Sequence, residues 1–149
     1  MVSAVCAGAL VAAGGTTWAG SAPQADLAFH GSAVMNGDLM EVRLTPRNNG
    51  PTAVPDASVR LSWSVPLAER QRLPVGCART DERSVVCGTG ALPAGGVGDQ
   101  IRVPVRLAER PAEVTLEVDT AWGGGVVDAN RSNDRLKVLV LDTGDTYSF

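Results

Sequence analysis

The stretch "DANRSND", residues 128–134, holds the side chains of this sequence best suited to binding a metal ion. Oxygen donors of the kind that calcium prefers come from Asp128, Asn130, Ser132, Asn133 and Asp134. The stretch is not an EF-hand loop, because Asn133 stands where that loop needs glycine and Leu139 where it needs a bidentate acid. Asp and Asn side chains also close turns by hydrogen bonding to nearby backbone. The sequence therefore favours a structural turn that binds no metal. Calcium is then expected to change the thermal stability of the protein little. The alternative is a calcium turn at Asp128, Asn130 and Asp134.

Side chains that support catalysis are sparse. His30 is the single histidine, and with Gly31 beside it the sequence predicts an exposed loop. No nucleophile-elbow or zinc pattern occurs, and the glycine-rich "GTGALPAGG" lacks the Lys-Ser/Thr pair of a phosphate-binding loop. Nothing singles out a pair among the sixteen acidic residues for glycoside hydrolysis. We therefore expect a non-enzyme without a cofactor.

Length and composition predict one globular domain. The chain has 149 residues, of which 44% are hydrophobic and 19% charged, enough to form one ordinary core. Its formal net charge is −3 and it has no basic block. Nucleic acid and anionic membranes are therefore not expected partners.

The first 22 residues predict an export signal. An apolar run, "AVCAGALVAAGG", is followed by small residues before a cleavage point after Ala22. The run is too rich in Gly and Ala for a typical membrane span, although no Lys or Arg precedes it. An uncleaved N-terminal anchor is the alternative. Residues 23–149 are then a single secreted or surface domain, with no membrane insertion and with a short tail from about residue 142.

Beyond the leader, apolar residues alternate with polar ones along the chain. In "ASVRLSWSV" every second residue from Ala57 to Val65 is apolar, which places Trp63 in phase with the core. The same pattern occurs around residues 40–44, 101–107, 114–118 and 136–140, with shorter candidates at 25–29 and 84–87. Such spacing predicts an all-β, immunoglobulin-like antiparallel sandwich of seven to eight strands. Pro104 predicts an edge or bulged strand, and "PLAERQRL" is the best candidate for a short helix.

Cys77 and Cys87 flank a predicted hairpin with a polar tip. In an exported protein, two such cysteines most simply form a disulfide. A metal site would lack two ligands, and a catalytic thiol would lack a nearby base. The sequence therefore favours a structural disulfide.

The order of the motifs resembles the immunoglobulin-like conserved repeats of bacterial surface and secreted proteins. That family is known as a domain of unknown function and is close to CARDB-type adhesion modules. The matching positions, within about residues 25–141, are Asn48, Asn49, Gly50 and Pro51; Cys77, Cys87, Leu92 and Gly95; and Asp128, Asn130, Asn133 and Asp134. Asp134 departs from the usual asparagine, and "VPLAERQRLP" from the usual "LPxGL". The resemblance implies an extracellular module rather than an activity.

The "NNGP" motif predicts a turn by which the chain leaves one sheet for the other. Asparagine and glycine tolerate positive φ, and proline fixes the turn geometry. A ligand loop is the alternative interpretation of these residues.

Two classes of function remain. A non-catalytic module that binds protein or a cell-wall polymer is favoured. A calcium-assisted carbohydrate-binding accessory domain would need exposed aromatic residues, and outside the core few are left: Trp122, Tyr147 and Phe149. A secreted enzyme inhibitor, acting through the tip of the Cys77–Cys87 hairpin, is a third alternative.

Overall fold

A computed structural model describes residues 20–149, which form a two-layered β-sandwich without helices. The predicted signal peptide lies almost wholly outside the described residues, and Cys6 lies outside them as well. Within residues 20–149 no helix has the length and apolar character needed to cross a membrane.

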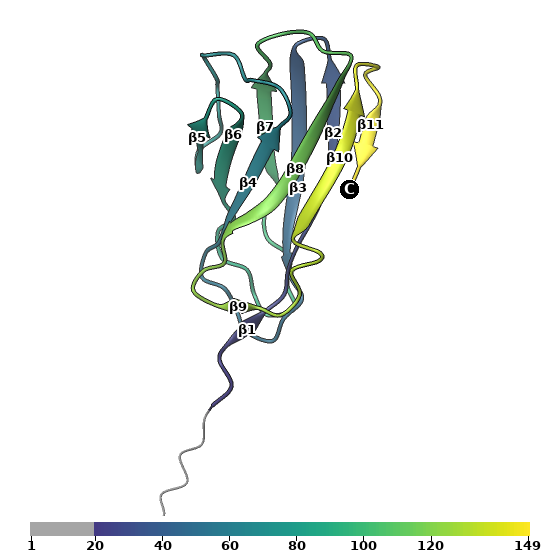
Figure 1. The fold of residues 1–149 in the computed structure, drawn as a ribbon. Helices are drawn as coiled ribbons and strands as arrows, with labels where there is room; N and C mark the ends of the chain where they lie inside the picture. Colours follow the sequence, from purple (N-terminus) through teal and green to yellow (C-terminus); the bar gives the residue numbers. More distant parts are fainter. Residues whose placement is uncertain (1–19) are drawn as a thin grey trace, which may run out of the picture.

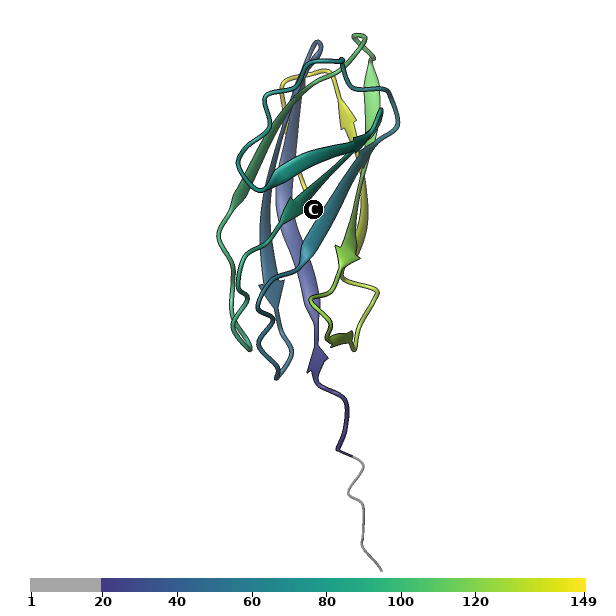
Figure 2. The same ribbon diagram turned by 90° about the vertical axis from the view of Figure 1, so that its left-hand side faces the viewer.

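The two sheets are antiparallel and contain nine strands (Figure 1). The first sheet has the order β10-β8-β4-β6-β5, formed by β4 (Ser58–Trp63), β5 (Cys77–Asp81), β6 (Ser84–Gly88), β8 (Glu113–Trp122) and β10 (Arg135–Leu141). The second has the order β11-β2-β3-β7, formed by β2 (Leu27–Asn36), β3 (Leu39–Asn48), β7 (Ile101–Arg106) and β11 (Thr146–Ser148). A short parallel pair, β1 (Gln24–Ala25) and β9 (Val127–Asp128), closes one end. We call this end, drawn at the bottom of Figures 1 and 2, the lower pole.

The alternating residues fill the space between the sheets, as predicted. Met40, Val42 and Leu44 of β3 are buried against the inward side chains of β4 and β8, and Trp63 is only 2% exposed. A second, smaller cluster lies at the lower pole and contains Ala25, Leu27, Val54, Ala57 and Leu92. The all-β sandwich is therefore confirmed.

Three local predictions differ from the structure. His30 lies within β2, not in a loop, although its side chain is exposed. The segment set apart as a tail contains β11, which pairs with β2, and Phe149 exchanges two backbone hydrogen bonds with Gly31 (2.9 and 3.0 Å). The ninth sandwich strand comes from this segment. Finally, the "PLAERQRL" stretch is irregular rather than helical.

Pro104 lies in β7, at the open edge of the four-stranded sheet, as predicted. The next outward backbone amide, that of Arg106, donates to the side chain of Gln71, whose Oε1 accepts it at 2.9 Å. In return, Gln71 Nε2 donates to the Arg106 carbonyl at 2.7 Å. Two residues earlier, on the same side of the strand, Pro104 has no N–H to offer. The outer edge of β7 therefore offers few free backbone groups, because Gln71 bonds those of Arg106 and Pro104 has no N–H.

The "NNGP" turn carries the chain from β3 into the other sheet, but not for the backbone reason expected. Among residues 20–149 no non-glycine residue has positive φ, and Gly50 is not among the glycines that do. A Cβ on Gly50 would lie 2.6 Å from the backbone of Ala25, so glycine is required by close approach. Asn48 is fully buried, and its Oδ1 accepts from the amides of Gly50 (3.0 Å) and Asp26 (3.3 Å). Its Nδ2 donates to the Thr52 carbonyl at 2.8 Å.

The disulfide is confirmed. Cys77 and Cys87 are direct partners across β5 and β6 and are bonded to each other. Cys87 is buried in the main core, and Cys77 packs against that core from its margin. Disulfides of this kind persist in oxidising compartments.

Removing the disulfide should destabilise the fold without changing its class. It joins residues ten positions apart, and closing a loop of that length stabilises a domain by about 3 kcal/mol. We expect Cys77→Ala with Cys87→Ala to lower the melting temperature clearly and to retain a β-type circular dichroism spectrum. Reduced wild-type protein is the control and should have the same melting temperature as the variant. An unchanged melting temperature would contradict the structural role.

Replacing Asn48 by alanine should lower the free energy of unfolding by about 3 kcal/mol, because two amides and a carbonyl lose their buried partner. Urea denaturation measures the difference. Asn49→Ala is the matched control, since the Asn49 side chain is exposed and bonds only to Arg47 (2.6 Å) among the described residues. Equal losses for the two variants would refute the special role of Asn48.

Candidate functional site

An exposed leucine marks a groove at the upper end of β7. Leu39 begins β3 with its side chain outward, because Met40, Val42 and Leu44 face the core, and it is 51% exposed. Two adjoining hollows of about 550 and 240 Å³ share it. We call them together the Leu39 groove, lined by Val34, Asn36, Leu39, Met40, Glu41, Arg70, Gln71, Arg72, Pro104, Val105 and Arg106.

The loop between β4 and β5 supplies the positive charge of this groove. Arg70 and Arg72 are exposed there, and neither makes an ion pair with any residue between 20 and 149. Gln71, between them, is held to the edge of β7 by the two hydrogen bonds to Arg106. The two guanidinium groups are therefore carried by an anchored loop rather than by a free one.

Arg79 anchors the same loop from the other side. Its guanidinium donates five hydrogen bonds of 2.7–3.2 Å to backbone carbonyls, those of Leu67, Ala68, Glu69, Asp81 and Glu82. Three of these carbonyls belong to the loop and two to the β5–β6 hairpin. One side chain thus supplies hydrogen bonds to backbone carbonyls of a stretch that has little regular secondary structure.

The acidic residue that lines the groove, Glu41, and the nearby Asp38 already have partners. Glu41 lies between Arg102 (2.8 Å) and Arg43 (2.8 Å), and the hydrogen bond from Arg102 is the main cause that lowers the pKa of Glu41. Asp38 pairs with Arg106. The unneutralised charge of the groove is therefore positive and lies on Arg70 and Arg72.

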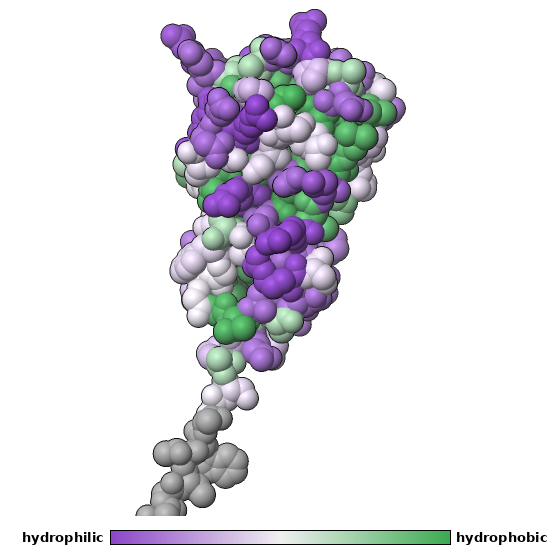
Figure 3. Space-filling view, in the orientation of Figure 1, coloured by the Kyte–Doolittle hydropathy of each residue, from purple (hydrophilic) through white to green (hydrophobic). Residues whose placement is uncertain are grey.

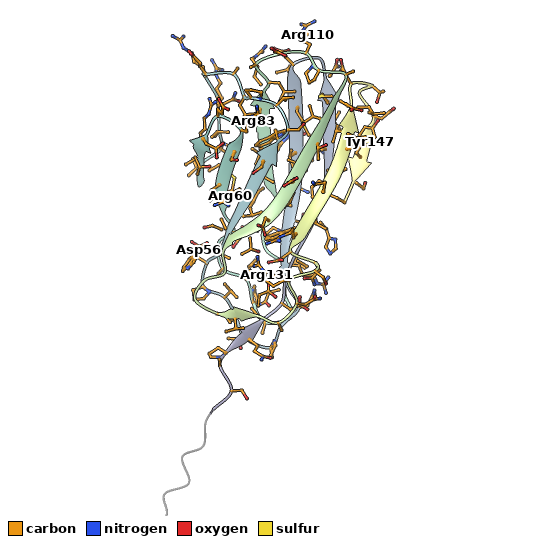
Figure 4. The ribbon with its side chains drawn as sticks, viewed as in Figure 1. Asp56, Arg60, Arg83, Arg110, Arg131 and Tyr147 are labelled. Atoms are coloured by element: carbon orange, nitrogen blue, oxygen red, sulfur yellow. A yellow bond between two sulfur atoms is a disulfide. The ribbon has the colours of Figure 1, made fainter. Side chains whose placement is uncertain are left out.

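The "DANRSND" stretch forms a polar turn at the lower pole. Asp128 Oδ1 accepts from the amide of Asn130 at 2.9 Å, and Asn130 Oδ1 accepts from the Ser132 hydroxyl at 2.5 Å. Asn130 is exposed, whereas Asp134 is fully buried. Arg131, labelled in Figure 4, lies beside it with Nη1 2.7 Å from Asp134 Oδ2, although the two groups are not aligned for a hydrogen bond.

The pKa of the Asp134 carboxyl is raised, mainly because burial disfavours its charged form. The nearby Thr120 hydroxyl and the Arg131 guanidinium oppose this shift, and the Asp128 carboxyl adds to it. A carboxylate is therefore held in surroundings that do not fully compensate its charge.

The structure does not bring the aromatic candidates together. Trp122 is 54% exposed and pairs with Ser58 at the lower end of β8. Tyr147 lies in β11, toward the other end of the sandwich (Figure 4), where its ring packs partly against the core and its hydroxyl is 3.3 Å from Thr143 Oγ1. His30 faces outward on β2, opposite Thr45. These side chains do not form one site.

The outer face of the five-stranded sheet is mainly hydrophilic along its middle, with apolar patches toward one side (Figure 3). A shallow hollow of about 370 Å³ between β8 and β10 is crossed by paired charges, Lys137 with Glu117 (2.7 Å) and Arg135 with Asp119 (3.5 Å). Across residues 20–149 no three His, Cys, Asp or Glu side chains gather at a single point. The charges that cross this hollow are therefore neutralised by one another, unlike Arg70 and Arg72 in the Leu39 groove.

Sequence reasoning missed the groove. One signal was present, since Leu39 is an apolar residue out of phase with the alternation of its strand. No local pattern indicated that Arg70 and Arg72 would lie beside it, because their loop is positioned by Arg79 and Gln71 rather than by a helical or strand period.

Comparisons with known proteins found no related sequence and one solved structure with a partial match. No family profile matches the chain, and no curated protein matches its sequence. Among solved structures, a similar one is β-glucosidase 3B from Thermotoga neapolitana in complex with α-D-glucose, with a TM-score of 0.49 and 12% identity. The match covers 84% of this chain and 17% of that protein.

Replacing Arg79 should loosen the groove and destabilise the domain. We expect Arg79→Ala to lower the free energy of unfolding by about 2–3 kcal/mol, because several carbonyls lose a charged donor. Arg79→Lys should not restore it, since one ammonium cannot reproduce the planar guanidinium fork. Arg60→Ala, an exposed residue of β4, is the control and should change the value by less than about 0.5 kcal/mol in urea denaturation. Rescue by lysine would contradict the proposed anchoring.

Proposed function

We propose that this chain is a non-catalytic, immunoglobulin-like module, secreted or displayed on a bacterial surface, that binds protein or a cell-wall polymer through the Leu39 groove. The observation that carries the proposal is the combination in that groove of an exposed leucine with two guanidinium groups that have no acidic partner among the described residues. Such a surface suits an extended partner bearing carboxylate or phosphate groups along an apolar backbone.

The character of the two arginines favours that chemistry. Guanidinium groups bind carboxylate and phosphate in a bidentate manner. The loop that carries them is fixed by Arg79 and Gln71, so less conformational freedom is lost when a partner binds. Because the net charge of the whole chain is −3, attraction of an anionic partner would be local rather than long-range.

Other features support the class of protein and its location. The motifs that resemble the immunoglobulin-like conserved repeats lie at strand ends, in loops and in the β5–β6 hairpin of a two-sheet sandwich, and the disulfide suits an oxidising compartment. A non-catalytic role is supported by the separation of the chemistry-bearing groups, with His30 on the outer face of β2 and Asp134 buried at the lower pole. We include export of the domain, after removal of residues 1–22, in this proposal.

Reversing the groove charge should weaken binding. The probe is purified bacterial cell wall, compared with the same wall after extraction of its anionic polymers. We expect Arg70→Glu with Arg72→Glu to reduce binding about tenfold or more, through loss of two charge-assisted contacts and added repulsion. Wild-type binding should weaken with salt and on the extracted wall.

The matched control is Arg47→Glu with Arg60→Glu, two exposed arginines away from the groove, of which Figure 4 labels Arg60. This variant should bind within about twofold of wild type. Retained binding by the groove variant would place the contact elsewhere. If the domain bound no wall preparation but did bind acidic proteins from the same source, the partner at this surface would be a protein and not a cell-wall polymer.

A further inference from the structure

Five buried oxygen atoms without a hydrogen-bond partner belong to one end of the molecule. They are Thr120 Oγ1, Asp128 Oδ2, Asn133 Oδ1, Asp134 Oδ1 and Asp134 Oδ2. In the described part of the chain, only one other buried side-chain polar atom, Trp63 Nε1, lacks a partner. Because buried polar atoms are nearly always satisfied, five such oxygens on four residues need an explanation.

The fold brings Thr120, Asp128 and Asp134 close to one another at the lower pole, and Asn133 directly precedes Asp134 in the chain. Arg135 pairs with Asp119 across β10 and β8, so the preceding Asp134 lies opposite Thr120. Asp128 is in β9, beside β1. Both the Thr120 hydroxyl and the Asp128 carboxyl lie close enough to Asp134 to act on its ionisation.

In Asn133 and Asp128, the second polar atom of the side chain is hydrogen-bonded to the protein. Asn133 Nδ2 donates to Asp26 Oδ1 at 2.8 Å, which fixes the amide and leaves its carbonyl oxygen available. Asp128 Oδ1 accepts from the Asn130 amide, which leaves Oδ2 available. The hydrogen bonds of the turn therefore orient the remaining oxygens instead of satisfying them.

Arg131 does not account for the cluster. Its guanidinium is 2.7 Å from Asp134 Oδ2, but it is unaligned and its side chain is 50% exposed. It offers no hydrogen bond to Asn133 Oδ1, Asp128 Oδ2 or Thr120 Oγ1. One positive charge also faces two carboxylates at this point.

We infer that Thr120 Oγ1, Asp128 Oδ2, Asn133 Oδ1 and the Asp134 carboxylate bind a calcium ion that stabilises the lower pole. All the donors are hard oxygens, from two carboxylates, one amide and one hydroxyl, and no thiolate or imidazole takes part. Calcium accepts such mixed, irregular sets, whereas magnesium demands near-ideal octahedral geometry.

This site differs from the calcium turn weighed in the sequence. The Asn130 side chain is not among the donors, because its oxygen accepts from Ser132. Thr120 and Asn133 take its place. The inference also predicts the opposite of the expectation from sequence, because bound calcium would raise the thermal stability of the protein.

The test compares the full chain, with its disulfide formed, in EDTA, in 10 mM Ca²⁺ and in 10 mM Mg²⁺. Extracellular calcium modules bind with dissociation constants of about 10⁻⁴–10⁻³ M. Binding to the native state alone should then raise the melting temperature by about 5 °C or more in Ca²⁺. Magnesium should have less effect, and calorimetric titration should give one calcium per chain.

Asp134→Asn and Asp128→Asn should each abolish the response to calcium. In EDTA, Asp134→Asn should melt at or above the wild-type temperature, because it removes a buried charge that Arg131 compensates only in part. Asp145→Asn, an exposed residue of the β10–β11 loop, is the control and should respond as wild type does. If Asp134→Asn fails to fold, Asp128→Asn decides the question. No calcium shift in the wild type, or an undiminished shift in Asp128→Asn, would overturn the site. Neither outcome bears on the Leu39 groove.

Discussion

The buried amide of Asn48 is the interaction on which the lower pole of this sandwich depends. It joins the start of the domain at Asp26 to the turn at Gly50–Thr52, and its own backbone amide donates to Gly96 in the loop after β6. Three segments far apart in sequence thus meet at one residue, two of them through its side chain and one through its backbone amide. Inside a protein each of these backbone groups would be costly to leave without a partner, so the second cluster, containing Leu27, Val54 and Leu92, packs around a satisfied polar centre.

The same solution recurs in the long loop after β4. Arg79 joins this loop to the β5–β6 hairpin with five hydrogen bonds, and Gln71 joins it to the edge of β7. In a domain whose described residues form no helix, long connections have few backbone partners of their own. Single polar side chains, used several times over, make those connections rigid enough to present groups such as Arg70 and Arg72.

The strands followed from the sequence because a half-buried strand shows its period directly. Residues 57–65 alternate without a break, and the inward residues of β3, β4, β7 and β8 were identified from that alternation. Gly31 interrupted it in β2, so His30 was placed in a loop. The requirement for glycine there comes mainly from the neighbouring strand, because a Cβ at Gly31 would lie 2.1 Å from the Arg43 carbonyl oxygen, and also 2.8 Å from the ring of Phe149. Contacts between residues so far apart leave no local pattern, which is also why the groove and the orphaned oxygens became visible only in three dimensions.

Each outer strand of the two sheets carries a feature that discourages another strand from joining it. At β7 these are Pro104, within the strand, and Gln71, which binds its edge from the β4–β5 loop. The strand β5 has a register shift after Arg79, β11 spans three residues, and β10 places Arg135 and Lys137 along its length. A polypeptide edge with free amides and carbonyls is a template on which further chains can add. Contacts between copies of this domain at high concentration would therefore pass through side chains rather than through a continuous sheet.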